Sequence, residues 1–251
     1  MEDSDLQQAA QILRDSQHLA VFTGAGMSQE SGIPTFRDAL TGLWARYDPT
    51  KLATPGAFEA DPGLVYRFYE HRRAKLADSQ PNAAHVALAR YQNARGGVTI
   101  VTQNVDGLHQ LAGSHPVICL HGDVRFDRCY AGCTGLVSPP PFEENRPLPP
   151  VCPVCRQAYL RPAVVWFGEI LDPVEWDAAE DTVQTASALL MIGTSAVVHP
   201  AAALPELVLE QGKPLIDVNP ASTPYSRRAT IYFPSTAGTI IPQLVSLALT
   251  S

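Results

Sequence analysis

Six short apolar segments recur along the chain, each followed by polar or glycine-rich residues: HLAVFT (18–23), GVTIVT (97–102), PVICL (116–120), ALLMI (188–192), PLIDV (214–218) and ATIYF (229–233). Near-continuous apolar runs of this length are typical of strands buried on both faces of a parallel sheet. Stretches of helical character lie between several of them, at about 57–77, 81–94, 173–186, 200–211 and 239–249. This alternation predicts an α/β fold with a doubly wound parallel sheet.

Polar residues follow five of these segments. They are Gly24–Gly26, Gln103–Asp106, His121–Asp123, Gly193–Ser195 and Asn219. In open α/β sheets, ligands bind beyond the carboxyl ends of the strands. We therefore expect these residues to gather at one edge of the sheet and to form a binding site there.

Two insertions interrupt the alternation of strands and helices. Residues 40–90 hold helices but no clear strand, and residues 124–163 hold four cysteines and the stretch SPPPFEENRPLPPVCP, whose prolines exclude a regular helix. The predicted division is a main α/β domain formed by 1–39, 91–123 and 164–251, a helical insertion, and a cysteine-containing module.

Composition narrows the possible partners and compartments. The net charge is −7 and lysines and arginines form no run, so nucleic acid is not an expected partner. No apolar run approaches the roughly 18 residues of a membrane span, and the first residues, MEDSDLQQAAQIL, do not resemble a secretory signal. We expect a cytoplasmic protein whose cysteines are thiols or metal ligands. The sequence leaves the oligomeric state open.

The loop after the first apolar segment has part of a dinucleotide-binding pattern. Gly24 and Gly26 follow a predicted strand, and glycine lets a backbone approach a phosphate closely. The third glycine of the usual fingerprint is replaced by Gln29, and no acidic residue suited to a ribose follows about 20 positions later. On the loop alone, a tight turn without a ligand is the alternative interpretation.

The whole string GAGMSQESGIPTFR (24–37) resembles the nucleotide loop of the sirtuins, the NAD-dependent protein lysine deacylases. Further stretches match sirtuin motifs in the family order: TQNVDGLH (102–109), HGD (121–123), the four-cysteine insertion, VVWFGE (164–169), GTSAVVHP (193–200) and VNP (218–220). The resemblance implies a Rossmann-like NAD domain with a smaller zinc-binding module and a helical insertion. This agrees with the fold predicted from the apolar pattern.

The resemblance also implies which residues bind NAD. Gln103 and Asn104 would lie at the nicotinamide ribose and Asp106 at the carboxamide, while Asn219 would meet the adenine-side ribose. The remaining cofactor residues implied are Gly24, Ala25, Gly26, Ser28, Ile33, Phe36, Arg37, Gly193, Thr194, Ser195 and Ala237. Without the resemblance, Asn104 and Asp106 are equally consistent with a turn at a strand end.

His121 is the predicted general base. A histidine titrates near neutrality and can accept a proton, although a single histidine at a strand end is often only structural. The resemblance implies that His121 accepts a proton from a ribose hydroxyl, with Asn104 and Asp106 as further catalytic residues. The reaction implied cleaves the nicotinamide–ribose bond and transfers the acyl group of a lysine to ADP-ribose.

Four cysteines form two pairs, Cys129-x3-Cys133 and Cys152-x2-Cys155, separated by 18 residues. Four thiolates from two loops predict a closed, structural, tetrahedral zinc site. The first pair departs from the commoner x2 spacing, and four unrelated buried thiols are the alternative.

Tyr69 and Arg72 are three residues apart on a predicted helix, so they share a face. The spacing resembles that of class III sirtuins, which remove succinyl, malonyl and related acidic groups, and Ala53 would keep the acyl pocket open. A solvated helix face is the alternative. The substrate peptide is expected to dock as an added strand along VVWFGE, with Val165, Phe167, Gly168 and Glu169 as contacts.

The predicted function is therefore NAD-dependent removal of acyl groups from lysines of proteins or peptides. A mono-ADP-ribosyltransferase or NAD glycohydrolase would cleave the same bond, and an NAD-sensing module would bind NAD without cleaving it. A dehydrogenase is disfavoured, because the acidic ribose partner of the usual fingerprint is missing.

Overall fold

The computed structural model describes residues 3–33, 48–141 and 147–250. Its larger lobe is built on a six-stranded parallel sheet with the order β3-β2-β1-β6-β7-β8. The strands are β1 (Leu19–Thr23), β2 (Val98–Thr102), β3 (Val117–Cys119), β6 (Ala188–Ile192), β7 (Leu215–Val218) and β8 (Ile231–Phe233). Each lies within one of the six apolar segments, so the predicted α/β class is confirmed.

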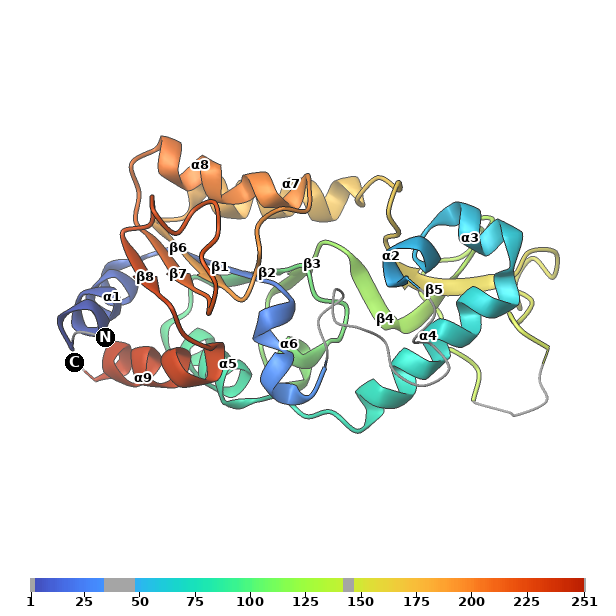
Figure 1. Cartoon of the computed structure of the whole chain (residues 1–251), viewed down its shortest axis with the longest axis horizontal. Coiled ribbons are helices and arrows are strands. Elements are labelled where there is room, and N and C mark those ends of the chain that lie inside the picture. Colours follow the sequence, from blue (N-terminus) through green and yellow to red (C-terminus); the bar gives the residue numbers. More distant parts are fainter. Residues whose placement is uncertain (1–2, 34–47, 142–146, 251) are drawn as a thin grey trace.

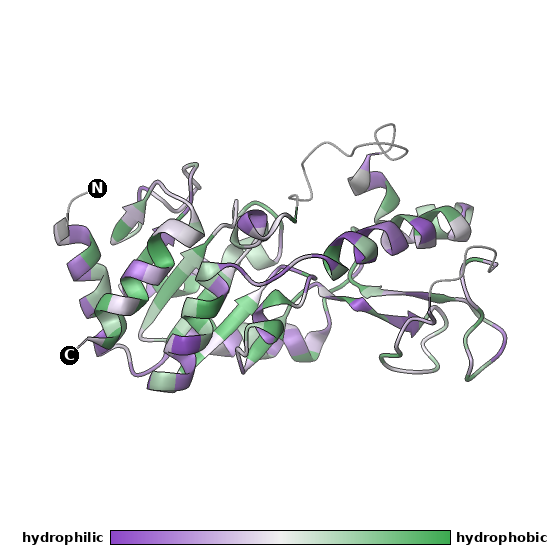
Figure 2. Cartoon of the chain, turned by 90° about the horizontal axis from the view of Figure 1, so that it is seen from below, coloured by the Kyte–Doolittle hydropathy of each residue, from purple (hydrophilic) through white to green (hydrophobic). Residues whose placement is uncertain are grey.

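Helices cover both faces of this sheet (Figure 1). One layer holds α1 (Asp3–Asp15), α5 (Ala83–Arg95) and α9 (Ala237–Leu249), and the other holds α7 (Pro173–Thr185) and α8 (Leu204–Glu210). Successive residues of β1 point into opposite cores: Leu19 and Val21 pack with the first layer, and Ala20 and Phe22 with the second. Figure 2 shows hydrophobic colouring on the strands and mixed colouring on the surrounding helices, as expected for a sheet buried on both faces.

The helix expected over 57–77 is two helices, α3 (Pro55–Ala60) and α4 (Pro62–Ala77), preceded by α2 (Pro49–Leu52). The break has a local cause. The side chain of Asp61 accepts a hydrogen bond from the backbone N–H of Leu64 at 2.8 Å, and Pro62 occupies the first turn, so Asp61 caps a new helix.

A smaller lobe contains a two-stranded antiparallel sheet, β4 (Gly122–Cys129) and β5 (Leu160–Val164), which the apolar pattern did not reveal (Figure 1). The predicted division into domains stays a prediction. α5 packs in the core of the large sheet, whereas that division assigned residues 83–90 to the helical insertion. Within the described residues, no helix is both long and apolar enough to cross a membrane.

The strand order places a topological switch beside β1, because the chain proceeds from β1 to β2 and β3 on one side and later to β6, β7 and β8 on the other. Ligands in such sheets bind where the order reverses, outside the carboxyl ends of the strands. The residues that follow β1, β2, β3, β6 and β7 surround this point. The segment that follows β2 leads directly into the short helix α6 (Leu108–Leu111).

Candidate active site

The glycine loop after β1 is packed against the loop after β6. The N–H of Gly26 donates to the carbonyl of Gly193 at 2.8 Å, and a Cβ on Gly26 would lie 2.8 Å from the Gly193 Cα. Gly193 has φ +59°, and a Cβ there would lie 2.4 Å from the Met27 nitrogen. Only glycine fits at these two positions, and the contact brings the loops after the two central strands together.

Buried polar groups form one network next to this contact. Ser28 Oγ donates to Asp106 Oδ2 at 2.7 Å and accepts from Asn104 Nδ2 at 3.0 Å. Asp106 Oδ1 accepts from the N–H of Leu108 at 2.9 Å. Burial raises the pKa of Asp106, and these hydrogen bonds oppose the rise. The structure thus brings together residues of the loops after β1 and β2, as predicted from their positions at strand ends.

A second set of contacts joins the ends of β2, β6 and β7. Gln103 Nε2 donates to Thr194 Oγ1 at 2.7 Å, and Asn219 Nδ2 donates to the carbonyl of Thr194 at 2.6 Å. Ser195 comes next along the chain and is exposed, whereas Ala237, at the start of α9, is buried. Four of the polar strand ends predicted to converge therefore lie side by side.

The beginning of the predicted cofactor loop is only partly described. Ala25 lies in a short 3₁₀ turn after Gly24, and Ile33 is half-buried. Phe36 and Arg37 lie outside the described residues.

His121 follows β3 and has a defined tautomer. Its Nδ1 lies 2.9 Å from the carbonyl oxygen of Gln103. A carbonyl can only accept, so Nδ1 carries the proton and Nε2 of the neutral ring is left as the basic nitrogen. Burial lowers the pKa of His121, and the hydrogen bond to Gln103 opposes the shift. A neutral imidazole with a basic Nε2 is the form that a general base requires.

Tyr69 and Arg72 of α4 lie near Asp106 of the buried polar network and do not form a solvated helix face. Tyr69 is buried, and its hydroxyl accepts from Trp166 Nε1 at 3.0 Å. Burial raises the pKa of Tyr69 to about 12. Burial also lowers the pKa of Arg72, while Tyr69 and Asp106 attract its charge and oppose the shift. The Arg72 guanidinium therefore lies close enough to Asp106 to interact with it electrostatically.

The VVWFGE segment lies across from these residues. The N–H of Phe167 donates to the carbonyl of Ala53 at 2.9 Å, and that of Val165 to the carbonyl of His121 at 2.9 Å. The Phe167 side chain is 44% exposed, whereas Ala53 is buried. These backbone bonds attach the segment both to the region before α3 and to His121.

The side chain of Glu169, predicted to contact substrate, instead forms hydrogen bonds and an ion pair with other residues of the protein. One carboxylate oxygen pairs with Arg161 Nη1, and the other accepts from Arg161 Nη2 at 2.9 Å and from the N–H of Trp166 at 2.8 Å. With Gly168 turning at φ +88°, Glu169 closes the loop on itself. Its carboxylate therefore fixes the shape of the segment.

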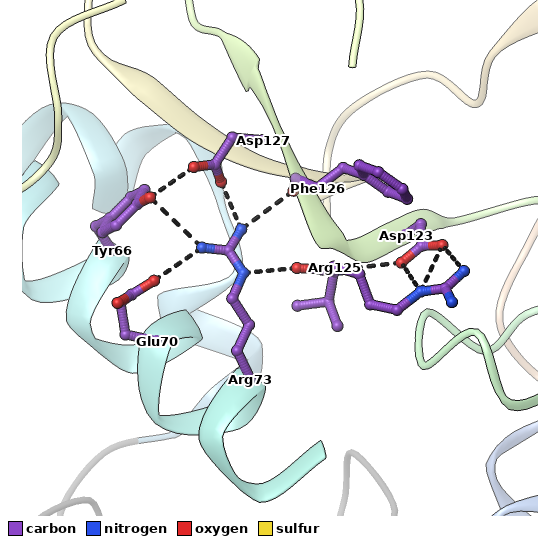
Figure 3. Close-up of polar contacts among 8 residues, drawn as sticks. Tyr66, Glu70, Arg73, Asp123, Arg125, Phe126 and Asp127 are labelled. Carbon is purple, nitrogen blue, oxygen red and sulfur yellow. Dashed lines mark hydrogen bonds and ion pairs between the residues drawn. The ribbon is translucent and has the colours of Figure 1, made fainter. Parts of the chain in front are cut away.

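Arg73 forms a clamp between α4 and β4 that was not predicted from the sequence (Figure 3). Arg73 pairs with Asp127, donates to the Val124 carbonyl at 2.6 Å, and pairs with Glu70 at 3.0 Å. Tyr66 donates to the second Asp127 oxygen at 2.5 Å. Asp127 is fully buried, so this clamp determines how the helix that carries Tyr69 and Arg72 sits on the smaller sheet.

Figure 3 also shows a second ion pair, between Arg125 and Asp123 at the start of β4. Arg125 covers Gly107, where a Cβ would fall 2.1 Å from its Cζ. Gly107 has φ +71° and directly follows Asp106. The ion pair thus supports the loop that carries Asp106.

The four cysteine thiols come together as predicted. The Sγ atoms of Cys129, Cys133, Cys152 and Cys155 all lie within 4.8 Å of one another, with pairs at 3.8 and 3.5 Å. Zn–S bonds of about 2.3 Å in a tetrahedron separate the sulfur atoms by about 3.8 Å. The thiols fit a structural zinc ion, and the x3 spacing is accommodated. Cys119 lies apart from them, with Gln110 Nε2 donating to its Sγ at 3.1 Å.

Comparison with known proteins gives a consistent result. The profile of the Sir2 family matches residues 24–200. The chain is 46% identical over 239 residues to the NAD-dependent protein deacylase of Methylococcus capsulatus, with 93% of each chain covered. A solved Sir2 homologue in complex with NAD matches with a TM-score of 0.87 and 42% identity, covering 96% of this chain and 93% of that one.

A mutant Sir2 homologue in complex with 2'-O-acetyl ADP ribose matches with a TM-score of 0.85 and 42% identity, covering 99% of this chain and 96% of that one. The motif order, the switch-point site and these similarities agree. The chain therefore belongs to the Sir2 family.

Proposed function

We propose that this chain is an NAD-dependent protein lysine deacylase that produces nicotinamide and O-acyl-ADP-ribose and that prefers succinyl and malonyl groups to acetyl. The observation that carries the proposal is the convergence of Ser28, Asn104, Asp106 and Thr194 on the segment after β2, where the Gln103 carbonyl also holds Nδ1 of His121. The Sir2 homologues solved with NAD and with 2'-O-acetyl ADP ribose support it.

When bound, NAD would supply an electrophilic glycosidic carbon, with nicotinamide as the leaving group. In this proposal Asp106 and Ser28 hold the carboxamide end, and Asn104 and Gln103 hold the nicotinamide ribose. The buried, mutually hydrogen-bonded state of Ser28, Asn104 and Asp106 keeps them oriented before NAD binds, which lowers the entropic cost of reaching a reactive geometry.

His121 would take a proton from a ribose hydroxyl at Nε2, while its Nδ1–H stays bound to the Gln103 carbonyl. That carbonyl stabilises the imidazolium formed, and it belongs to a residue proposed to hold the same ribose. The base and the group it deprotonates are therefore positioned by one backbone segment.

The four cysteines would hold zinc outside the reaction. A four-thiolate site has no open position for substrate, so its role is to close the loops around β4 and β5. We also propose a cytoplasmic location, because a reducing compartment would keep these four cysteines available as thiolate ligands for zinc.

The acyl preference rests on Arg72. Its guanidinium, partly withdrawn from water, would form charge-assisted hydrogen bonds with the terminal carboxylate of a succinyl or malonyl group, and the Tyr69 hydroxyl would add another. An acetyl group offers no carboxylate, so it would bind without these bonds.

The test compares succinyl-lysine and acetyl-lysine forms of one peptide with wild type, Arg72→Met and, as control, Arg67→Met on the exposed face of α4. Hydrogen bonds to a charged group contribute about 1.5–3 kcal/mol, so wild-type kcat/KM should favour succinyl-lysine by about ten-fold or more. Arg72→Met should reverse the preference and Arg67→Met should keep it. Equal efficiencies before and after the Arg72 substitution would refute the assignment.

A further inference from the structure

Two histidines that the proposed mechanism does not use lie next to each other under the site. His85 of α5 and His109 of α6 are 0% and 1% exposed, with ring centroids 4.8 Å apart. One nitrogen of each ring, Nε2 of His85 and Nδ1 of His109, has no hydrogen-bond partner among the described residues.

The contacts of His85 locate its proton. The backbone N–H of Asn82 donates to His85 Nδ1 at 3.4 Å, as part of the capping box that begins α5. Nδ1 is therefore an acceptor without a proton. Burial lowers the pKa of His85 to about 4, so the ring is neutral and its single proton is on Nε2.

The contacts of His109 locate the other proton. Thr102 Oγ1 accepts from the N–H of Asn104 at 3.0 Å and from the hydroxyl of Thr23 at 2.8 Å. Because the Thr23 proton is used in this way, Thr23 Oγ1 is the acceptor for His109 Nε2, 3.1 Å away, and Nε2 carries the proton. Burial lowers the pKa of His109 to about 3, so its Nδ1 has no proton.

The two unpartnered nitrogens are therefore one donor and one acceptor, in adjacent rings. We propose that His85 Nε2–H donates to His109 Nδ1 through one buried water, and that the resulting relay positions Asn104 for the reaction. The relay runs from Asn82 through both rings, Thr23 and Thr102 to the backbone N–H of Asn104. The inference rests on the proposed role of Asn104 at the nicotinamide ribose.

The relay reaches both walls of the site. At its far end, Asn82 Nδ2 donates to the carbonyl of Met27 at 2.8 Å, which ties the start of α5 to the glycine loop after β1. At its near end, Asn104 donates from its side chain to Ser28 at 3.0 Å. His85 and His109 are thus positioning residues, because they hold the loops after β1 and β2 in one relative arrangement without touching the substrate.

The first test needs no ligand. Long-range ¹H–¹⁵N correlation spectra of the ¹⁵N-histidine-labelled protein report the tautomer of each ring, with His85→Gln and His109→Gln for assignment. The relay predicts that both buried rings are neutral Nε2–H tautomers at pH 7. A proton on His109 Nδ1, or a charged ring at pH 7, would overturn it.

The second test separates positioning from packing. In His109→Gln, the side-chain amide keeps a donor for Thr23, whereas His109→Leu keeps only the volume. We expect His109→Leu to lower kcat for nicotinamide release about ten- to hundred-fold, with the peptide KM within two-fold of wild type, and His109→Gln to recover most of the loss. His18→Gln, an exposed histidine, is the matched control.

Equal activity of the Leu and Gln variants would show that the ring is only packing and would overturn the proposal. If His109→Leu does not fold, the tautomers of His85 and His109 in the wild-type spectra test the relay: two Nε2–H rings support it, and any other state overturns it. A wild-type protein that does not cleave NAD would contradict the proposed function, while the spectra of the ligand-free protein would still test the relay.

Discussion

Removing the guanidinium of Arg73 should destabilise the fold strongly, because it leaves a buried carboxylate without its cation. Arg73→Met deletes the ion pair with Asp127, which is fully buried, and the hydrogen bonds to two β4 carbonyls at 2.6 and 3.1 Å. Breaking a buried pair from one side costs about 3–5 kcal/mol of unfolding free energy. Burial raises the pKa of Asp127 even with Arg73 present, so the variant's carboxyl should protonate more readily still.

Urea unfolding followed by circular dichroism measures this loss, with Arg67→Met on the exposed face of α4 as the control. The pKa of Asp127 in the folded variant would be raised above its unfolded value. The difference in unfolding free energy between wild type and Arg73→Met should therefore be largest above that raised pKa. It should become smaller as the pH falls through that pKa. The double variant Arg73→Met/Asp127→Asn should recover part of the loss. If Arg73→Met lowers the unfolding free energy by less than about 1 kcal/mol, or by an amount that does not change with pH, the stabilising role assigned to the Arg73–Asp127 pair is refuted.

Three further predictions follow from the cysteines and the histidines. The purified protein should contain one zinc ion, and removing it with a chelator should lower Tm by more than about 10 °C, because structural zinc contributes many kcal/mol to folding; no metal and an unchanged Tm would contradict the site. Because burial lowers the pKa of His121, the acid limb of kcat/KM should have its midpoint below the ordinary histidine value of 6.5, and a midpoint above 7 in the pH–rate profile would contradict its proposed role as base. The pKa values of His85 and His109 are lowered to about 4 and about 3, so the unfolded chain takes up protons below pH 6.5 while the folded protein does not. Unfolding free energy should then fall with pH from 6.5 down to those values, by about 1.4 kcal/mol per unit for each ring, and a slope unchanged in His109→Gln would contradict this.

The large sheet could be predicted because its central strands are buried on both faces and the sequences of its strands are almost wholly apolar. β6, with the sequence ALLMI, is the clearest example. β4 could not be recognised in this way, since it reads GDVRFDRC and its partner β5 lies more than 30 residues further along the chain. Its polar residues are satisfied by tertiary contacts, such as those of Asp127, which no local pattern reports.

The candidate site shows the same limit. Asn104, His121 and Thr194 follow strands of one parallel sheet, so their convergence could be inferred from topology. The bonds of Glu169 to Arg161 could not be inferred, because residues eight apart on a strand and a loop meet only when the loop folds back. The pairing of His85 with His109 likewise depends on how α5 packs under α6, and neither histidine lies in a pattern that indicates a buried pair.

The central claim is that residues after separate strands surround a single NAD molecule. A crystal structure of the chain with NAD and an acyl-lysine peptide tests it most directly. The claim predicts one dinucleotide in contact with Gly26, Asn104 and Thr194, and the nicotinamide ribose facing Nε2 of His121. A dinucleotide bound elsewhere, or a ribose separated from His121 by the VVWFGE segment, would contradict it.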